Sequence, residues 1–297
     1  MNNNEKYYGN KQNNGDQIQH MSLSELKPFE AQPFKVRMDE SMDELVESVK
    51  EGGVLTPLVV RPHKDGGYEI LSGHRRAKAS ELAGRKTVPV IVRDLDDDMA
   101  AILLVDSNLQ REYILPSEKA FAYQLKLEAM KRKAGRPSKE NVGQIVPNFS
   151  GKRSTEIIGE QSGESYKQVQ RYIRLTELID PLLDMVDEKK LPLNAAVELS
   201  YLGTKAQADV VESIEKHETV PSIEQSAKIR RFCKDGKVNP DVIDSIMQEE
   251  KPEKLKVVLK EDRLREYFPK SYSKKQIEDT IMKLIKQWAR RRSEPER

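Results

Sequence analysis

The sequence has 297 residues and a formal net charge of +2, with 34% charged, 37% hydrophobic and 6% aromatic residues. This length accommodates two or three domains, and the low aromatic content favours small helical modules over one large core. The single cysteine, Cys233, excludes an internal disulfide and a cysteine cluster for metal, as expected of a reducing cytosol. We recognise neither a signal peptide nor a membrane-spanning run in the sequence, so we expect a cytoplasmic protein with no membrane partner.

The first part of the chain alternates predicted strands and helices after a polar start. Residues 1–17 are rich in Asn, Gln and Gly, which predicts a disordered tail. Strands are predicted at 18–23, 57–61, 68–72 and 88–92. Helices are predicted from a capping box at Ser41-x-x-Glu44 to Gly52, and at 73–83, 97–105 and 117–133. This alternation predicts a small mixed α/β domain at residues 18–115.

Two polar stretches of this domain have the chemistry of an anion site. In Ile70–Ala79 a strand leads through Gly73 into a helix that opens with His74, Arg75 and Arg76. Glycine permits close backbone approach to an anion, and helix N-termini and arginines bind phosphate. A solvated basic helix gives the same pattern, so the second stretch, 108–112, matters. Its carboxamides, arginine and carboxylate are suited to closing a nucleotide site and holding a divalent ion.

With these two stretches, and with 52–61 before them, residues 18–203 resemble the ParB/Spo-type partition family. That family carries a Gly-x-x-Arg box and an Asn-x-Gln-Arg box in this order. The resemblance implies CTP and Mg²⁺ as cofactors, with CTP converting an open dimer into a clamp around DNA. The expected nucleotide contacts are Thr56, Gly73, His74, Arg75, Arg76, Asn108, Gln110 and Arg111, and the expected metal ligands are Asn108 and Glu112.

Two departures from the family pattern leave turnover open. His74 and Ser107 stand where the family often has glutamates. If such a carboxylate aligns the attacking water, its absence leaves nucleotide binding intact while hydrolysis of CTP to CDP and phosphate becomes weak. His74 as a catalytic base is the alternative, although a lone histidine beside arginines is more often an ordinary polar residue.

Residues 134–153 read as a basic linker, since Gly135-Arg136-Pro137, Pro147 and Gly151 interrupt the helical pattern. The Gly-Arg-Pro triplet is similar to the core of an AT-hook, which places Arg136 in a minor groove. The alternative is a flexible linker that makes only non-specific phosphate contacts.

The stretch 154–175 has the spacing of a helix-turn-helix. Gly159 lets two helices approach, Gly163 makes the turn and Val169 buries the second helix, which Ser165-x-x-Gln168 caps. Outward Gln and Arg near the start of such a helix read base edges in the major groove. The expected DNA-binding residues are Ser165, Lys167, Gln168, Gln170, Arg171 and Arg174, together with Arg136 of the linker. The alternative is a helical hairpin with a solvated charged face.

Further helices are predicted at 180–189, 193–202, 205–216 and 222–234, so that a helical DNA-binding domain spans 116–235. Residues 236–297 are expected to form a C-terminal region. There Ser273-x-x-Gln276 begins a helix with one apolar face, formed by Ile277, Ile281, Leu284, Ile285 and Trp288. This face is expected either to pack on 255–259 or to form a dimer interface.

The sequence therefore predicts an α+β protein: a small mixed α/β domain, an all-α helix-turn-helix domain and a small helical C-terminal region. The expected function is nucleotide-gated, site-specific DNA binding in chromosome or plasmid partition, as a homodimer on an inverted-repeat site, associated with the nucleoid. A partner ATPase of the ParA type is implied by the resemblance alone. The alternatives are a transcriptional or nucleoid regulator of a mobile element, and an enzyme on the scaffold shared with sulfiredoxin. Sulfiredoxin needs a cysteine in the phosphate box, which this chain lacks. A nuclease needs a carboxylate cluster suited to two metals, and no such cluster is evident in the sequence.

Overall fold

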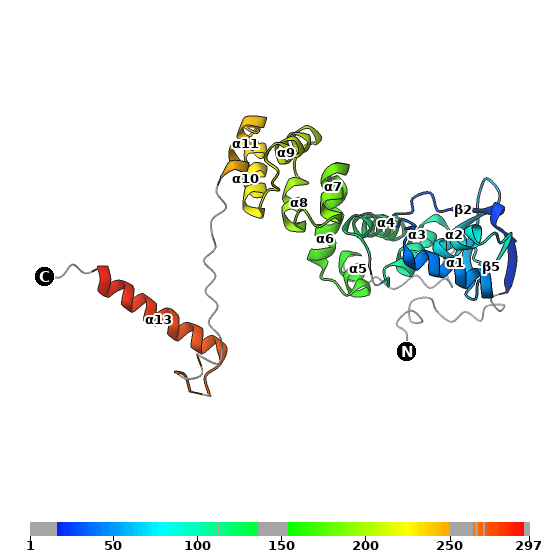
Figure 1. Ribbon diagram of the computed structural model, residues 1–297, viewed down its shortest axis with the longest axis horizontal. Helices are drawn as coiled ribbons and strands as arrows, with labels where there is room; N and C mark the ends of the chain where they lie inside the picture. Colours follow the sequence, from blue (N-terminus) through cyan, green and yellow to red (C-terminus); the bar gives the residue numbers. More distant parts are fainter. Residues whose placement is uncertain are drawn as a thin grey trace. The chain divides into compact units, whose positions relative to one another are not determined.

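The computed structural model of the protein describes residues 17–111, 113–135, 154–249, 264, 267–269 and 271–293. Contacts divide the chain into two compact units, Met1–Glu249 and Glu250–Arg297. The first unit contains a sheet with its helices, followed in sequence by a series of shorter helices (Figure 1). This confirms the predicted fold class, a mixed α/β domain followed by helices.

The sheet has five strands in the order β1-β5-β3-β4-β2. The pairs β3/β5 and β2/β4 are parallel, and the pairs β1/β5 and β3/β4 are antiparallel. The strands are β1 (Ile18–Ser22), β2 (Leu26–Pro28), β3 (Leu58–Pro62), β4 (Tyr68–Ser72) and β5 (Thr87–Val92). The four predicted strands are confirmed. The three-residue β2 was not predicted, because it is too short to show an alternating pattern.

Helices cover both faces of the sheet. They are α1 (Glu40–Gly52), α2 (His74–Leu82), α3 (Asp97–Asn108) and α4 (Pro116–Gly135). Leu58 of β3 lies opposite Val90 of β5, and both are fully buried in one core, which Ile70 of β4 joins. The next residue, Leu71, packs in another core with Leu104 of α3. Successive strand side chains point to opposite faces, so β4 contributes to both cores.

The predicted cap of α1 is wrong by two residues. Asp39 is the N-cap, and its carboxylate accepts a hydrogen bond of 3.1 Å from the backbone N–H of Met42. The Ser41 hydroxyl donates to Asp39 instead of capping the helix. Aspartate and serine cap helices equally well, and the extended backbone at Asp39 decides between them.

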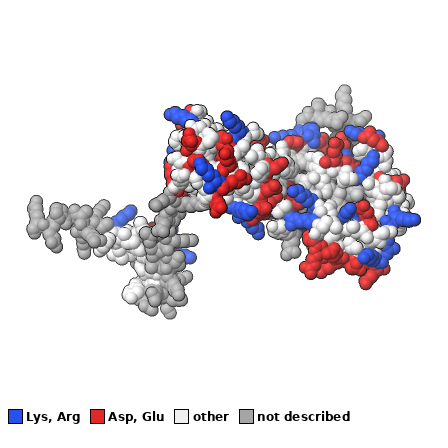
Figure 2. All heavy atoms as spheres, turned by 45° about the horizontal axis from the view of Figure 1, so that its top comes forward, with Lys and Arg blue, Asp and Glu red and all other residues white. Residues whose placement is uncertain are grey.

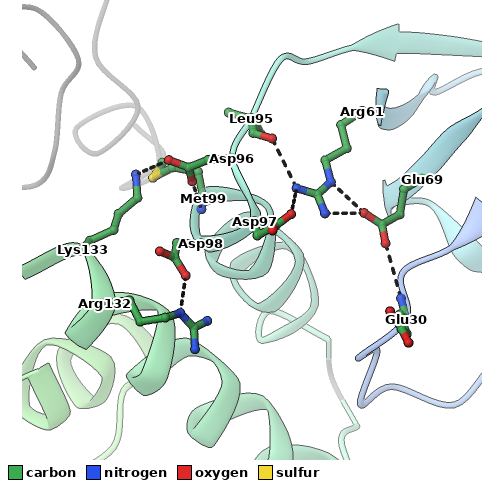
Figure 3. Close-up of polar contacts among 10 residues, drawn as sticks. All are labelled: Glu30, Arg61, Glu69, Leu95, Asp96, Asp97, Asp98, Met99, Arg132 and Lys133. Carbon is green, nitrogen blue, oxygen red and sulfur yellow. Dashed lines mark hydrogen bonds and ion pairs between the residues drawn. The ribbon is translucent and has the colours of Figure 1, made fainter. Parts of the chain in front are cut away.

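Three consecutive aspartates, Asp96, Asp97 and Asp98, anchor the start of α3. Their carboxylates each bind a different cation, Asp96 with Lys133 at 3.3 Å, Asp97 with Arg61 at 2.8 Å and Asp98 with Arg132 at 2.7 Å (Figure 3). Arg61 belongs to β3, and Arg132 and Lys133 lie near the end of α4. The start of α3 is therefore fastened both to the sheet and to the far end of α4.

Helix α4 belongs to more than one core. Its Ala122 and Ala129 pack with α3 and the sheet. Its Tyr123 and Met130 pack with α5 (Ser154–Ser162) and α6 (Tyr166–Arg174). Because the same helix is buried on both sides, the mixed domain and the following helices share it as a common element.

The remaining helices of the first unit form one apolar core. They are α7 (Asp180–Asp187), α8 (Leu193–Leu199), α9 (Thr204–His217), α10 (Ile223–Lys234) and α11 (Pro240–Gln248). Helix α11 was not predicted, and its Ile243 and Met247 lie in the same core as the preceding helices. The first compact unit therefore includes α11 and extends to Glu249. Cys233 is half-buried against this core.

Helix α13 (Lys274–Ser293) is described within the second unit. The predicted helix start at Ser273-x-x-Gln276 is confirmed. It is a capping box, because Ser273 N–H donates to Gln276 Oε1 at 2.8 Å and Gln276 N–H donates to Ser273 Oγ at 3.3 Å. On its apolar face Ile277 is buried, whereas Leu284 and Trp288 are exposed. The expected partner segment 255–259 lies outside the described residues. Within the described part of the chain, no helix combines the length and apolar character needed to span a membrane.

Candidate functional site

The turn from β4 into α2 requires a glycine. Gly73 is the N-cap of α2 and has a φ of 100°, in the left-handed region that disfavours other residues. A Cβ atom at this position would lie 2.9 Å from Cγ of Leu58 and 3.1 Å from Nη2 of Arg76. The missing side chain thus lets the Arg76 guanidinium pack directly over the turn.

Arg76 holds the stretch 52–61 against the turn from β4 into α2. Its Nη1 donates to the backbone carbonyls of Thr56 and of Pro57, the latter at 2.8 Å. Burial lowers the pKa of Arg76. Thr56 itself is exposed, and its backbone is fixed by this arginine. In the structure Arg76 therefore positions the backbone near Thr56, which differs from the free phosphate cradle that the sequence predicted.

The two polar stretches meet at a cluster of arginines. Arg75 donates to Ser41 at 2.6 Å and to Asp39 at 3.2 Å. The guanidinium of Arg111 lies 5.3 Å from the centre of the Phe34 ring. Burial lowers the pKa of Arg111, as does repulsion from Arg75 and Arg37. Mutual repulsion of this kind requires proximity, so residues that are 36 positions apart, Arg75 and Arg111, share one site.

His74 lies beneath these arginines with one nitrogen unused. It is 6% exposed, and its Nε2 is buried with no hydrogen-bond partner among the described residues. Burial and the nearby Arg111 lower the pKa of His74 to about 4, although a hydrogen bond with the backbone of Ile70 opposes this. The imidazole is therefore neutral near pH 7 and offers a buried acceptor.

The Asn-x-Gln-Arg stretch ends α3. Asn108 is 5% exposed, and its Nδ2 donates to the carbonyl of Leu104 at 2.7 Å. Ser107 bonds to the same carbonyl at 3.0 Å, and Gln110 is exposed. Glu112, the other expected metal ligand, lies outside the described residues. Among the residues that are described, no three His, Cys, Asp or Glu side chains gather as a metal site.

Three residues that sequence reasoning missed complete the cluster. Glu118 of α4 is 3% exposed and accepts from the backbone N–H groups of Lys35 and Leu115, each at 3.0 Å. Arg37 lies 3.9 Å from Glu118 and 5.0 Å from the centre of the Tyr113 ring. Arg37 and Tyr113 lie in irregular segments that have no periodicity, so the sequence carries no signal for them.

Helices α5 and α6 meet at the tight turn that the sequence predicted. A Cβ atom on Gly159 would lie 2.5 Å from the carbonyl oxygen of Glu164, so only glycine fits. Gly163 makes the turn with a φ of 72°, and Val169 is fully buried. Ser165 caps α6 by accepting from the N–H of Gln168 at 3.2 Å.

The outer face of α6 carries most of the predicted polar residues. Lys167, Gln170 and Arg171 are exposed, and Gln168 Oε1 accepts from Arg171 at 3.3 Å. The prediction that Arg174 faces outward is wrong. Its guanidinium donates to the carbonyl of Ser200 at 2.6 Å and stacks 4.2 Å from the centre of the Tyr201 ring, because the adjoining α8 offers these partners. Arg136 lies outside the described residues.

The surface of this protein carries positive and negative side chains near one another. Figure 2 shows Lys and Arg interspersed with Asp and Glu on the face that it draws, in keeping with a formal net charge of only +2. A long-range field contributes little in such a protein, so any anion must be recognised by particular groups such as the arginine cluster.

Comparisons with known proteins identify relatives of this chain. Residues 8–109 match the model of the ParB N-terminal domain. A probable chromosome-partitioning protein ParB of Vibrio cholerae is 31% identical over 209 residues, which cover 70% of this chain and 64% of that protein. A probable chromosome 1-partitioning protein ParB of Deinococcus radiodurans is 35% identical over 182 residues, which cover 61% and 55%. The chain thus spans less than two thirds of either relative.

Two structures of C-terminally truncated ParB from Caulobacter crescentus are also similar. The complex with the centromeric parS site is 21% identical, covers 78% of this chain and 100% of that one, and has a TM-score of 0.42. The complex with CTP-gamma-S is 26% identical, covers 67% and 99%, and has a TM-score of 0.31. Both scores are low, so the relationship is shown by sequence. Residues 8–109 are therefore identified as a ParB N-terminal domain, in a chain that is similar to chromosome-partitioning ParB proteins.

Proposed function

We propose that this protein is a site-specific DNA-binding protein of partition type whose mixed domain binds CTP. The observation that carries the proposal is that Arg111 lies near both Arg75 and Arg37 and also near the buried His74. Among the described residues, Asp39 and Glu118 are the carboxylates that form ion pairs with these arginines, so the cluster retains positive charge for a polyphosphate. The choice of cytosine rests on similarity to the ParB family, since no described residue selects one base.

Magnesium enters this proposal together with the nucleotide. Asn108 has a carboxamide oxygen at the end of α3, and Mg²⁺ in nucleotide sites takes most of its ligands from phosphates and water. Glu112 is proposed as a second oxygen ligand. The described residues fit an ion held mainly by the bound triphosphate, not one held by a cage of protein ligands.

DNA binding is proposed for α5 and α6 as a helix-turn-helix. The tight approach at Gly159 and the cap at Ser165 fix α6 with Lys167, Gln170 and Arg171 toward solvent. Side chains of these types form paired bonds with guanine and adenine edges in the major groove. Arg174 is left to hold α6 against α8, and Arg136 of the linker is proposed as a phosphate contact.

The remaining features of the proposal follow from the family. A homodimer matches an inverted-repeat site by its own two-fold symmetry, and CTP closes it into a clamp on DNA. The exposed apolar face of α13 is proposed as part of the dimer interface. A ParA-type ATPase is the proposed partner, and the proposed location is the cytoplasmic nucleoid. With His74 and Ser107 in place of glutamates, any CTP hydrolysis is proposed to be weak.

Calorimetric titration tests the nucleotide site. CTP is titrated into the wild-type protein, with ATP, GTP and UTP as controls, and then into Arg111→Ala and Lys78→Ala. Lys78 lies on α2, and its ion pair within the described part of the chain is with the neighbouring Glu81, so it is the matched control. We expect selective CTP binding that Arg111→Ala weakens by about tenfold or more, because a hydrogen bond to a charged group is worth roughly 1.5–3 kcal/mol. Equal binding by wild type and Arg111→Ala, or no nucleotide binding at all, contradicts the proposal.

A further inference from the structure

A buried lysine joins α3 to the helix-turn-helix. Helix α3 ends at Asn108, the first residue of the polar stretch 108–112, which is called the nucleotide box below. Lys126 of α4 is 1% exposed. Its ammonium group donates to the carboxylate of Asp106 on α3 and to Oε1 of Gln161 on α5. One side chain therefore contacts helices on both sides of α4, and Asp106 precedes Asn108 of the nucleotide box by two residues.

Two further residues of α4 continue this polar seam. Lys119, Tyr123 and Lys126 follow at intervals of four and three, which places them on one helix face. Nζ of Lys119 lies 2.7 Å from Glu164 at the α5–α6 turn and 5.2 Å from the centre of the Tyr172 ring. The rings of Tyr123 and Tyr172 are 5.9 Å apart at an angle of 73°.

The seam is only partly satisfied. The Tyr123 hydroxyl and Oε2 of Glu164 are buried beside each other, and neither makes a hydrogen bond of ordinary geometry with a described residue. Burial raises the pKa of Tyr123, and burial lowers the pKa of Lys126 although Asp106 opposes that change. Partly satisfied buried polar groups usually have a role other than stability.

Stability alone is a poor reason for a lysine here. Apolar side chains that replace both partners of a buried ion pair are often tolerated at no cost in stability, because the two charges then need no desolvation. What the lysine adds is direction, since its ammonium group must meet Asp106 and Gln161 together. Any shift of α3 relative to α5 leaves a buried charge without its full set of partners, so intermediate arrangements are disfavoured.

We infer that Lys126 is a positioning residue that transmits the state of the nucleotide box to the helix-turn-helix through Asp106 and Gln161. This inference rests on the proposed function, because it requires both a nucleotide site on the mixed domain and DNA binding by α5 and α6. Lys126 touches neither ligand. It sets the position of α5 relative to the end of α3.

The test compares the effect of CTP on DNA binding in Lys126→Met with that in wild type. The DNA is a labelled duplex selected by the wild-type protein from random sequences, and its dissociation rate is measured with and without CTP. Lys126→Met keeps the length of the side chain and removes its charge. Gln161→Ala removes only the α5 contact and leaves the pair with Asp106, so it serves if Lys126→Met does not fold. Lys50→Met, on the exposed face of α1, is the control.

We expect Lys126→Met and Gln161→Ala to bind CTP alone and DNA alone with affinities within about twofold of wild type. The ratio of the DNA dissociation rates with and without CTP should move towards one in both variants. Lys50→Met should behave as wild type. A merely structural lysine would alter melting temperature but leave the CTP effect unchanged, and an unchanged CTP effect in both variants overturns the inference. If the variants retain the effect while wild type binds CTP and DNA, the proposed function stands. If wild type binds no nucleotide, both fail.

Discussion

Acid should weaken the mixed domain through His74. The pKa of His74, about 4, lies below the ordinary value of 6.5. Between these pH values the unfolded chain therefore binds a proton at this residue that the folded chain does not bind. Stability is then complete above pH 6.5 and falls as pH decreases towards 4. The interval is 2.5 pH units, which corresponds to roughly 3 kcal/mol as an upper bound.

The variant His74→Gln isolates this contribution. Glutamine is polar and of similar size but does not titrate, so its stability should depend less on pH than that of wild type between 6.5 and 4.5. The difference between the two slopes should amount to about 2–3 kcal/mol over this range. Carboxylates titrate equally in both proteins and cancel. His20→Gln, at an exposed position on β1, is the control for the loss of a histidine.

The measurement has to be local. The only tryptophan, Trp288, lies in the other compact unit, so its fluorescence does not report on β4 and α2. Hydrogen exchange of peptides from 68–82, corrected for the intrinsic effect of pH on exchange, gives the free energy of opening in this region. Parallel pH dependence in wild type and His74→Gln would refute the reasoning, since it would mean that the histidine is no harder to protonate when folded.

Three further predictions follow from single contacts. Gly159→Ala should lower the free energy of unfolding by about 1–3 kcal/mol in urea titrations and weaken DNA binding, because the added methyl group meets the Glu164 carbonyl at 2.5 Å; wild-type values would contradict this. Arg171→Ala should reduce DNA affinity by about 1–3 kcal/mol and relax sequence preference in a binding titration, and an unchanged preference would remove it from the reading face. Arg61→Ala should lower the free energy of unfolding by about 3–5 kcal/mol in thermal unfolding, because it leaves the carboxylate of Glu69, 4% exposed, without its cation (Figure 3). The double variant Arg61→Ala/Glu69→Gln should recover part of this loss.

Local patterns explain why much of the fold was predictable. Apolar alternation located β3, β4 and β5, and glycines at positions 73, 159 and 163 marked points where the backbone or a close approach admits no side chain. Such features depend on a few neighbouring residues, which the sequence displays directly. The helix start at Ser273-x-x-Gln276, also predicted, belongs to the same class.

Side-chain direction was less predictable, because distant partners decide it. Arg76 stands in the phosphate box but bonds to carbonyls 19 and 20 residues earlier in the chain. Arg174 has the spacing of an outward residue, yet Ser200 of a later segment holds it. Ser41 had the spacing of a cap, and Asp39 took that position. In each case the competing partner is an ordinary polar group that a periodic pattern does not distinguish.

Helix α3 explains how the proposed nucleotide site and the proposed DNA-reading helix can be linked without direct contact. Its start is held by Arg61 of the sheet, and its last turn contains both Asp106 and Asn108. Within one rigid turn, a ligand cannot displace the Asn108 end without moving the carboxylate that Lys126 requires. Because Lys126 is almost completely buried, solvent cannot replace that carboxylate cheaply. A small movement at the nucleotide box is therefore expected to pass to α5 as a choice between two packed arrangements, and not to be absorbed as gradual loosening.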